Sequence, residues 1–189
     1  MKQFSYLISK ALVFTFLITI ENTSGKSLIN STCLDIARDD PNIDYSFCTT
    51  SLQAAPTSHC STLQGLATIS MKLLRYNITD TRCFIKNLIK KSRASDPYLR
   101  VCLSDCFELF SEAIPSVKQA MRDYTKKRLD DANVEISSIM DGATTCEQGF
   151  MEKRGVVSPL TERNNHTFQL SAMALSILHI IQELATPSL

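Results

Sequence analysis

Cysteine is the residue type in this chain whose spacing is most informative about chemistry. Seven cysteines are present, and none lies in the first 25 residues. Cysteine thiols can form disulfides, bind metals or act as redox centres, and the compartment decides which of these occurs. The seven positions are Cys33, Cys48, Cys60, Cys83, Cys102, Cys106 and Cys146.

The N-terminal segment 1–25 indicates an oxidising compartment. Lys2 and Lys10 provide positive charge, residues 11–20 are uncharged and apolar, and small residues follow at 23–25. This is the pattern of a secretory signal peptide, and its apolar run is too short for a transmembrane helix, which needs about 20 residues. We therefore expect a secreted mature chain with disulfides and no membrane association.

Other chemistry-bearing patterns are missing from the sequence. His59, His166 and His179 show no paired metal-ligand spacing, and neither a Gly-rich phosphate loop nor a nucleophile elbow occurs. Cys102 and Cys106 are spaced i, i+4, which we interpret as a core thiol beside a structural disulfide. The sequence thus predicts a protein that is not an enzyme and holds neither a metal nor a cofactor.

The charge balance excludes a broad class of partners. Removing Lys2, Lys10 and Glu21 with the leader from 20 basic and 19 acidic residues leaves equal numbers of each. A neutral mature chain lacks the net basic field of a nucleic-acid binder, although basic runs remain at 90–93 and 126–128. Three acidic residues at helical steps, Asp105, Glu108 and Glu112, are interpreted as a solvated helix face.

Apolar residues recur at steps of three and four through most of the chain, which predicts an all-α fold. Four such stripes indicate an antiparallel four-helix bundle over 59–185, preceded by a helical hairpin over 27–56. The stripes are Leu66, Ile69, Leu73, Tyr76, Asp80, Cys83, Phe84 and Leu88; Leu99, Cys102, Cys106, Leu109, Ala113, Val117, Ala120 and Tyr124; Ala132, Ile136, Ile139, Ala143, Cys146 and Phe150; and Leu170, Ala174, Ile177, Ile181 and Leu184.

Capping residues predict where the helices begin. Asp96 directly before Pro97 is typical of a helix start, and Ser158 before Pro159 is similar. Pro115 falls inside the second bundle helix, which we expect it to kink rather than end. Short connections near 94–96, 126–130 and 154–159 favour up-down-up-down topology.

Two cysteine pairs follow from these elements. Cys106 and Cys146 occupy core positions on consecutive antiparallel helices, so their side chains can meet across the bundle. Cys33 and Cys48 flank the turn of the N-terminal hairpin. Cys60, Cys83 and Cys102 remain; a third bridge among them stays open, and the odd total leaves at least one thiol unpaired within the chain.

Secretion also makes the Asn-x-Ser/Thr sequons relevant. Asn30, Asn77 and Asn165 are glycosylation candidates, whereas Asn22 is lost with the leader.

Several motifs resemble the plant invertase and pectin methylesterase inhibitor family, in order and spacing. They are residues 41–48 ending in Cys48, residues 63–67, residues 105–110 around Cys106, and residues 145–150 around Cys146. Residues 157–161 and 169–171 resemble most closely the invertase inhibitors of plane-tree pollen. The resemblance covers about residues 27–185 and implies one inhibitor-like domain over 26–189, a hairpin on a four-helix bundle, and two disulfides.

The resemblance also implies a partner and a place. Family members block acid invertase or pectin methylesterase by non-covalent complex formation, which implies secretion to the apoplast or cell wall, with the vacuole as an alternative. A 1:1 complex and an otherwise monomeric protein are expected.

The choice of target depends on one turn. Invertase inhibitors of the family carry Pro-Lys-Phe between the second and third bundle helices, but that turn here reads Arg128-Leu129-Asp130-Asp131. The tripeptide is missing, although Lys126, Lys127 and Arg128 supply positive charge nearby. Asp130 and Asp131 would meet the acidic groups of a glycosidase cleft. These five charged residues are the candidate target contact, and the two targets stand nearly even.

Two other interpretations of the sequence are an apolar-ligand carrier and an inhibitor relative without a target. A secreted helical bundle can carry a small apolar ligand in its core, but these stripes are filled with Leu, Ile, Phe and Tyr. An allergen-like relative without an enzyme target is the other alternative.

Overall fold

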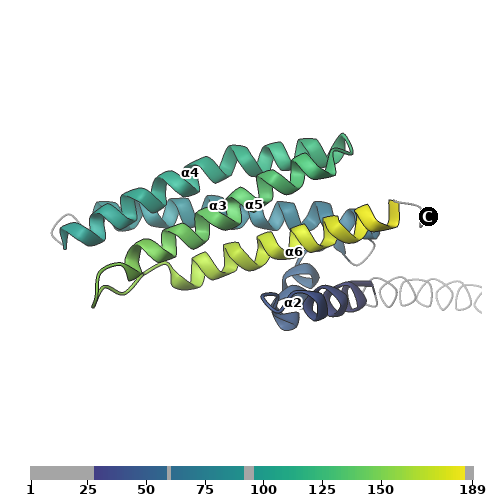
Figure 1. Ribbon diagram of the computed structural model, residues 1–189, viewed down its shortest axis with the longest axis horizontal. Helices are drawn as coiled ribbons and strands as arrows, with labels where there is room; N and C mark the ends of the chain where they lie inside the picture. Colours follow the sequence, from purple (N-terminus) through teal and green to yellow (C-terminus); the bar gives the residue numbers. More distant parts are fainter. Residues whose placement is uncertain (1–27, 59–60, 92–95, 186–189) are drawn as a thin grey trace, which may run out of the picture.

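Four long helices form the body of the molecule. The computed structural model describes residues 28–58, 61–91 and 96–185, and every regular element within them is a helix. The bundle consists of α3 (Leu63–Lys91), α4 (Pro97–Thr125), α5 (Leu129–Met151) and α6 (Thr161–Ala185). Each helix runs antiparallel to the one before it (Figure 1). The predicted all-α bundle is confirmed.

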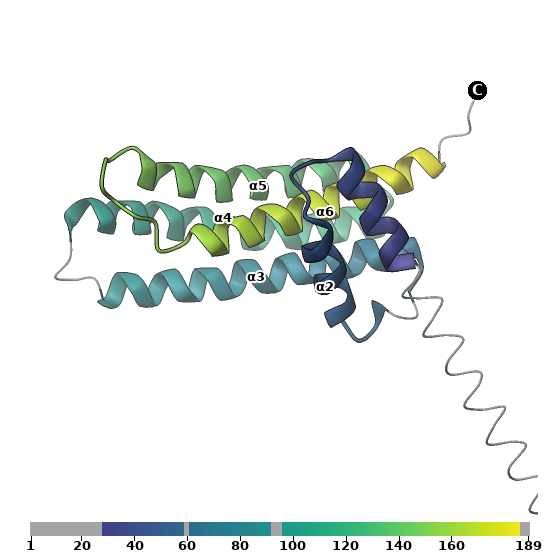
Figure 2. The same ribbon diagram turned by 90° about the horizontal axis from the view of Figure 1, so that it is seen from below.

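A shorter pair of helices, residues 28–39 and α2 (Tyr45–Ala54), forms the N-terminal hairpin. A disulfide joins Cys33 to Cys48, with their Cα atoms 5.7 Å apart. The hairpin lies against the side of the bundle near α6, as both views show (Figures 1 and 2). There the amide of Asp44 donates to Oε1 of Gln169, 3.0 Å away. The predicted signal peptide lies outside the described residues.

The helix starts follow the predicted caps. The Asp96 carboxylate accepts a hydrogen bond from the Tyr98 amide at 2.9 Å, with Pro97 at the first helical position. The hydroxyl of Ser158 accepts from the Leu160 amide at 3.1 Å, although α6 itself begins at Thr161. Helix α4 continues through Pro115, as expected.

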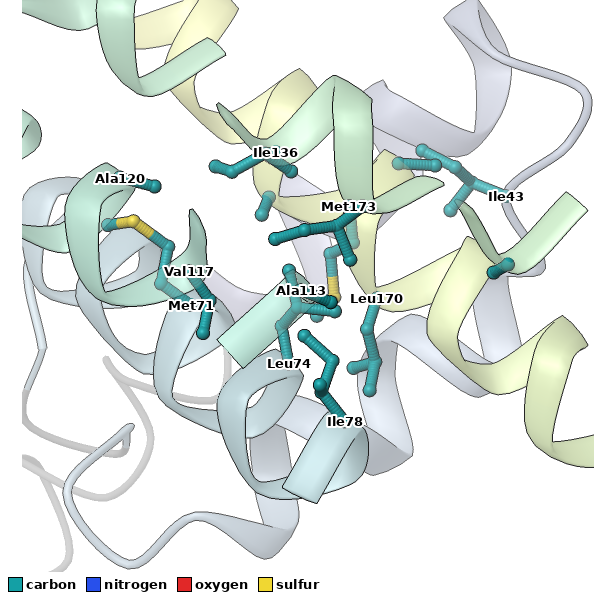
Figure 3. Packing of buried hydrophobic residues seen from close by; sticks show 14 of the residues in the cluster. Ile43, Met71, Leu74, Ile78, Ala113, Val117, Ala120, Ile136, Leu170 and Met173 are labelled. Carbon is teal, nitrogen blue, oxygen red and sulfur yellow. The ribbon is translucent and has the colours of Figure 1, made fainter. Parts of the chain in front are cut away.

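The core is built from the inner faces of all four long helices. Figure 3 shows Leu74 and Ile78 of α3, Val117 of α4 and Met173 of α6 packed together, all of them fully buried. The disulfide between Cys106 and Cys146 lies in the same core and connects α4 to α5, with a Cα separation of 4.9 Å. Every residue of the predicted α5 stripe is buried.

The predicted stripe on α3 was confirmed at Leu66 and Ile69, which are buried, but was wrong in its register from Leu73 onward. Tyr76 is 75% exposed and Cys83 is also exposed, whereas Leu74, Ile78 and Ile85 are fully buried. The true stripe is offset by about one residue, or about 100° around the helix. Helix α3 has apolar residues on two neighbouring faces. A register through Leu73 and a register through Leu74 therefore both show steps of three and four.

Helix α6 is long and apolar enough, by length and composition alone, to cross a membrane. In the structure it packs against α3 and α5 and buries Met173, Ala174, Ile177 and Leu178. Its apolar composition therefore follows from its place in the bundle core.

Candidate functional site

The turn between α4 and α5 is the candidate contact that the sequence predicted, and its backbone is tightly fixed. The amide of Lys126 donates to the carbonyls of Arg122 and Asp123 at 3.1 and 3.0 Å. Lys127 has a φ of 59°, in the left-handed region that residues other than glycine seldom adopt. The Arg128 amide then donates back to the Asp123 carbonyl at 2.9 Å, which closes the turn.

The side chain of Arg128 is part of this closure. Its guanidinium forms an ion pair with Asp123, whose side chain is only 3% exposed. Gln119 Nε2 donates to both Asp123 carboxylate oxygens, at 2.9 and 2.8 Å. Hydrogen bonds from Arg128 first, and from Gln119 next, hold the pKa of Asp123 below its usual range. The Asp123 carboxylate in turn raises the pKa of Arg128.

The two acidic residues after the turn also have partners within the chain. Asp131 Oδ2 lies 3.2 Å from Arg128 Nε, and Asp130 Oδ1 accepts from Gln182 Nε2 at 3.0 Å. Both lie in the first turn of α5, where the helix dipole favours negative charge. Their structural role accounts for their presence here.

The five candidate contact residues therefore divide into two groups. Arg128, Asp130 and Asp131 are held by contacts within the molecule, whereas Lys126 and Lys127 are exposed and form no salt bridge among the described residues. The side chain of Arg128 remains 48% exposed while it pairs with Asp123 and Asp131, so its role as a target contact stays a prediction. Two adjacent lysines at the end of the bundle remain for a partner.

The unpaired cysteines have different surroundings. Cys83 is exposed and Cys102 is buried, and both are free; Cys60 lies outside the described residues. Burial raises the pKa of the Cys102 thiol. Its Sγ donates to the Gly149 carbonyl at 3.4 Å, a carbonyl that also accepts from the Tyr98 hydroxyl. These contacts indicate a packed core thiol.

The histidines and the acidic residues of α4 do not form a common site among the described residues. His166 stacks near Phe47 with ring centroids 5.3 Å apart, and His179 Nε2 lies 3.2 Å from Glu183 Oε1 on α6. His59 lies outside the described residues. Within the part of the chain that the structure describes, no three His, Cys, Asp or Glu residues come together as a metal site would require. Asp105, Glu108 and Glu112 are exposed on α4.

The three candidate sequons differ in exposure. Asn30 and Asn165 are exposed. Asn77 is half-buried, and its Oδ1 accepts a hydrogen bond from Thr167 Oγ1 at 2.7 Å. Exposed asparagines leave more room for a glycan on the folded protein, so the geometry favours the first two.

The clefts bear on the apolar-carrier interpretation. A cleft of about 120 Å³ lies between α4 and α5, beside the small residues Ala113, Gly142 and Ala143. It is well below the roughly 300–1,000 Å³ of ordinary ligand pockets. A larger hollow of about 390 Å³ lies beside residues 36–40 and α6, but Asp39, Asp40 and Glu183 make its lining partly acidic. Neither cleft suits a fatty acid or a sterol.

The sequence of this chain matches one protein family and several of its members. The family model "Plant invertase/pectin methylesterase inhibitor" matches residues 27–177. A protein from Platanus acerifolia named "Putative invertase inhibitor" is 37% identical over 168 residues, covering 89% of this chain and 93% of that protein. A pectinesterase inhibitor from Actinidia deliciosa is 25% identical over 177 residues, covering 94% of each.

Solved structures agree on the fold. The crystal structure of a mutant form of a pectin methylesterase inhibitor from Arabidopsis superposes with a TM-score of 0.64 at 24% identity. The match covers 72% of this chain and 89% of that one. The chain therefore belongs to the plant invertase/pectin methylesterase inhibitor family.

Proposed function

We propose that this protein is a non-covalent inhibitor of a plant carbohydrate-active enzyme, and that acid invertase is its first target. The bundle would cover the substrate cleft of the enzyme, with the α4–α5 turn as part of the contact. The observation that carries this choice is the pair of exposed lysines, Lys126 and Lys127, on a turn fixed by the Arg128 and Asp123 ion pair.

The contacts of the charged residues favour invertase as the target, whereas the sequence alone left the two targets nearly even. A glycosidase of this type holds a pair of carboxyl groups at its cleft. The sequence predicted that Asp130 and Asp131 would repel these groups, but Asp131 pairs with Arg128 and Asp130 accepts a hydrogen bond from Gln182. Lys126 and Lys127 are exposed at the tip and form no salt bridge among the described residues, so their charges can contact an acidic cleft. The 37% identity to two Platanus proteins named "Putative invertase inhibitor" supports the same target.

Pectin methylesterase is the second candidate. The turn lacks the Pro-Lys-Phe tripeptide of invertase inhibitors, and relatives at 25–26% identity are named pectinesterase inhibitors. Within such a family the fold does not determine the target. Both enzymes therefore belong in every assay.

We also propose secretion to the apoplast or cell wall, with the vacuole as the alternative. Residues 1–25 have the composition of a signal peptide, and the two disulfides suit an oxidising compartment. Glycosylation at Asn30 and Asn165 belongs to the same proposal.

The test is a charge change at the tip that leaves the turn intact. Lys126→Ala and Lys127→Ala together, with Arg128 kept, should weaken invertase inhibition by about tenfold, mainly through slower association. The matched control is Arg100→Ala with Lys118→Ala, two exposed basic residues of α4 that form no salt bridge among the described residues. Arg128 is kept because its loss would also destabilise the turn, and a lost contact with the enzyme could then not be distinguished from a disrupted turn.

Each outcome has a separate meaning. Unchanged inhibition by the Lys126 and Lys127 double variant would rule out these lysines as the contact. Inhibition of pectin methylesterase alone would make the second candidate the target. An absence of inhibition by the unaltered protein toward both enzymes would contradict the proposed function.

A further inference from the structure

Opposite charges are segregated on two helices of the bundle. Helix α3 carries six basic residues and one acidic residue, whereas α5 carries five acidic residues and no basic one. Both helices pack against α4 and α6, so α3 and α5 occupy opposite corners. Figure 2 shows them on opposite edges of the bundle. The nearly neutral net charge therefore conceals one basic face and one acidic face.

The acidic residues of α5 are largely engaged within the molecule. Asp131 pairs with Arg128, and Asp130 accepts from Gln182. Glu147 accepts hydrogen bonds from Ser158, Thr161 and Asn164, which link the start of α6 to α5.

The basic residues of α3 are not neutralised in this way. The one acidic residue of α3, Asp80, forms its ion pair with Arg163 of α6, at 2.6 Å. Among the described residues, no carboxylate forms a salt bridge with any basic residue of α3. Those that are exposed are Lys72, Arg75, Lys86, Lys90 and Lys91. The basic face is therefore the one whose charge is available to a partner.

These residues form a line along the helix. Lys72, Arg75, Lys86 and Lys90 are separated by steps of three, eleven and four, which keeps them near one face. At a rise of 1.5 Å per residue the line extends over about 27 Å. Tyr76, 75% exposed, lies beside Arg75 and adds a flat aromatic surface to this face.

We infer that the outer face of α3 binds an extended polycarboxylate, namely an acidic polysaccharide such as demethylated pectin. A row of cations matches a polymer whose charges repeat along its length. Lysine ammonium groups are compact charges on flexible stems and can follow such a chain without a fixed geometry. The exposed tyrosine can stack against the carbon-bound hydrogens of a sugar ring.

An acidic protein surface is the less favoured partner. Protein interfaces usually depend on a cluster of buried aromatic and apolar anchors. On this face Tyr76 is the one large hydrophobic side chain of α3 that is strongly exposed among the described residues. The choice of pectin among polyanions rests on the second candidate of the proposed function, pectin methylesterase, because hydrolysis of the methyl esters of pectin converts a neutral polymer into a polycarboxylate.

The experiment measures binding of the full mature protein to polygalacturonate oligomers in the absence of any enzyme. The same oligomers with fully methylated carboxyl groups are the neutral ligand. Lys72→Gln, Arg75→Gln and Lys86→Gln together form the test variant, since Gln retains helix propensity. The control removes three exposed positive charges elsewhere, by Arg100→Gln, Lys118→Gln and Arg154→Gln.

We expect the acidic oligomer to bind and the methylated oligomer not to bind. The α3 variant should weaken binding at least about tenfold and reduce its dependence on salt, because fewer counterions are released. The control variant should stay within about twofold, since its charges lie off the line.

Three results would overturn the inference: no binding of the acidic oligomer, equal binding of both oligomers, or equal loss in both variants. Salt-sensitive pairing of two copies, or loss of enzyme inhibition in the α3 variant without oligomer binding, would assign the face to a protein partner instead. A protein that binds the oligomer yet inhibits neither enzyme would support this inference and contradict the proposed function.

Discussion

Arg128 forms an ion pair with the buried carboxylate of Asp123, across the turn that joins α4 to α5. The pair connects the last turn of one helix to the first residue before the next. It holds Lys127 in its left-handed conformation and leaves the two lysines of the tip exposed. The shape of the candidate contact thus depends on a residue whose guanidinium is already paired with a buried carboxylate.

Arg128→Ala should destabilise the turn, because it leaves the buried Asp123 carboxylate with Gln119 as its remaining side-chain donor. We expect a fall in Tm on the order of 5 °C. Lys127→Ala should leave Tm almost unchanged, since its side chain is exposed. Thermal unfolding followed by circular dichroism measures both, and equal Tm values would show that the ion pair does not stabilise the turn.

The same carboxylate predicts a dependence of stability on pH. The pKa of Asp123 is lowered in the folded protein, so its contribution is complete above about pH 4, the ordinary range of an aspartate. It is lost as pH falls through the folded pKa. Asp123→Asn should therefore flatten the decline of Tm between about pH 4 and 2.

Asp105→Asn, at an exposed position, is the control for this measurement. It should leave the decline of Tm at low pH unchanged. Part of the decline should persist in Asp123→Asn as well, since the pKa of Asp96 is also lowered, first by the Tyr98 amide. A decline identical in Asp123→Asn and the unaltered protein would refute the argument.

Alkylation of the native protein should distinguish the free thiols. Cys83 is exposed and should react first, whereas Cys102 is buried with a raised pKa and should react only on unfolding. Peptide mass spectrometry on the labelled protein should also recover the Cys33 to Cys48 and Cys106 to Cys146 bridges. Rapid labelling of Cys102, or its recovery in a disulfide, would show that the α4–α5 packing differs from the structure.

The register of α3 can be tested by two substitutions. Ile78→Ala removes a fully buried side chain and should lower the free energy of unfolding by about 2–5 kcal/mol. Tyr76→Ala, at a position 75% exposed, should change it by no more than about 0.5 kcal/mol. Denaturant unfolding gives both values, and a larger loss for Tyr76 would restore the register that the sequence alone favoured.

Much of the architecture could be predicted from the sequence, because individual residues mark where a helix begins and which face of it is buried. Asp96 with Pro97 marks the start of α4, and the α5 stripe from Ala132 to Phe150 is buried throughout. Cys106 and Cys146 follow from those two helices, because core positions on antiparallel neighbours approach one another.

Other features depend on three-dimensional contacts that periodicity does not contain. In α3, Leu73 and Leu74 satisfy the same spacing on adjacent faces, and only packing against α4 and α6 selects Leu74. The role of Arg128 required the left-handed Lys127 that brings its guanidinium back to Asp123. The sequence signal for this ion pair was an acidic residue in the last turn of one helix, Asp123, followed five positions later by a basic residue, Arg128.

Inhibition is tested by the activity of each enzyme, measured against increasing concentrations of the purified mature protein. Acid invertase and pectin methylesterase should be titrated in parallel, between about pH 4 and 7, where the Asp123 contribution to the turn is retained. We expect a saturable loss of invertase activity at or below about micromolar protein. Full activity of both enzymes under these conditions would contradict the proposed function.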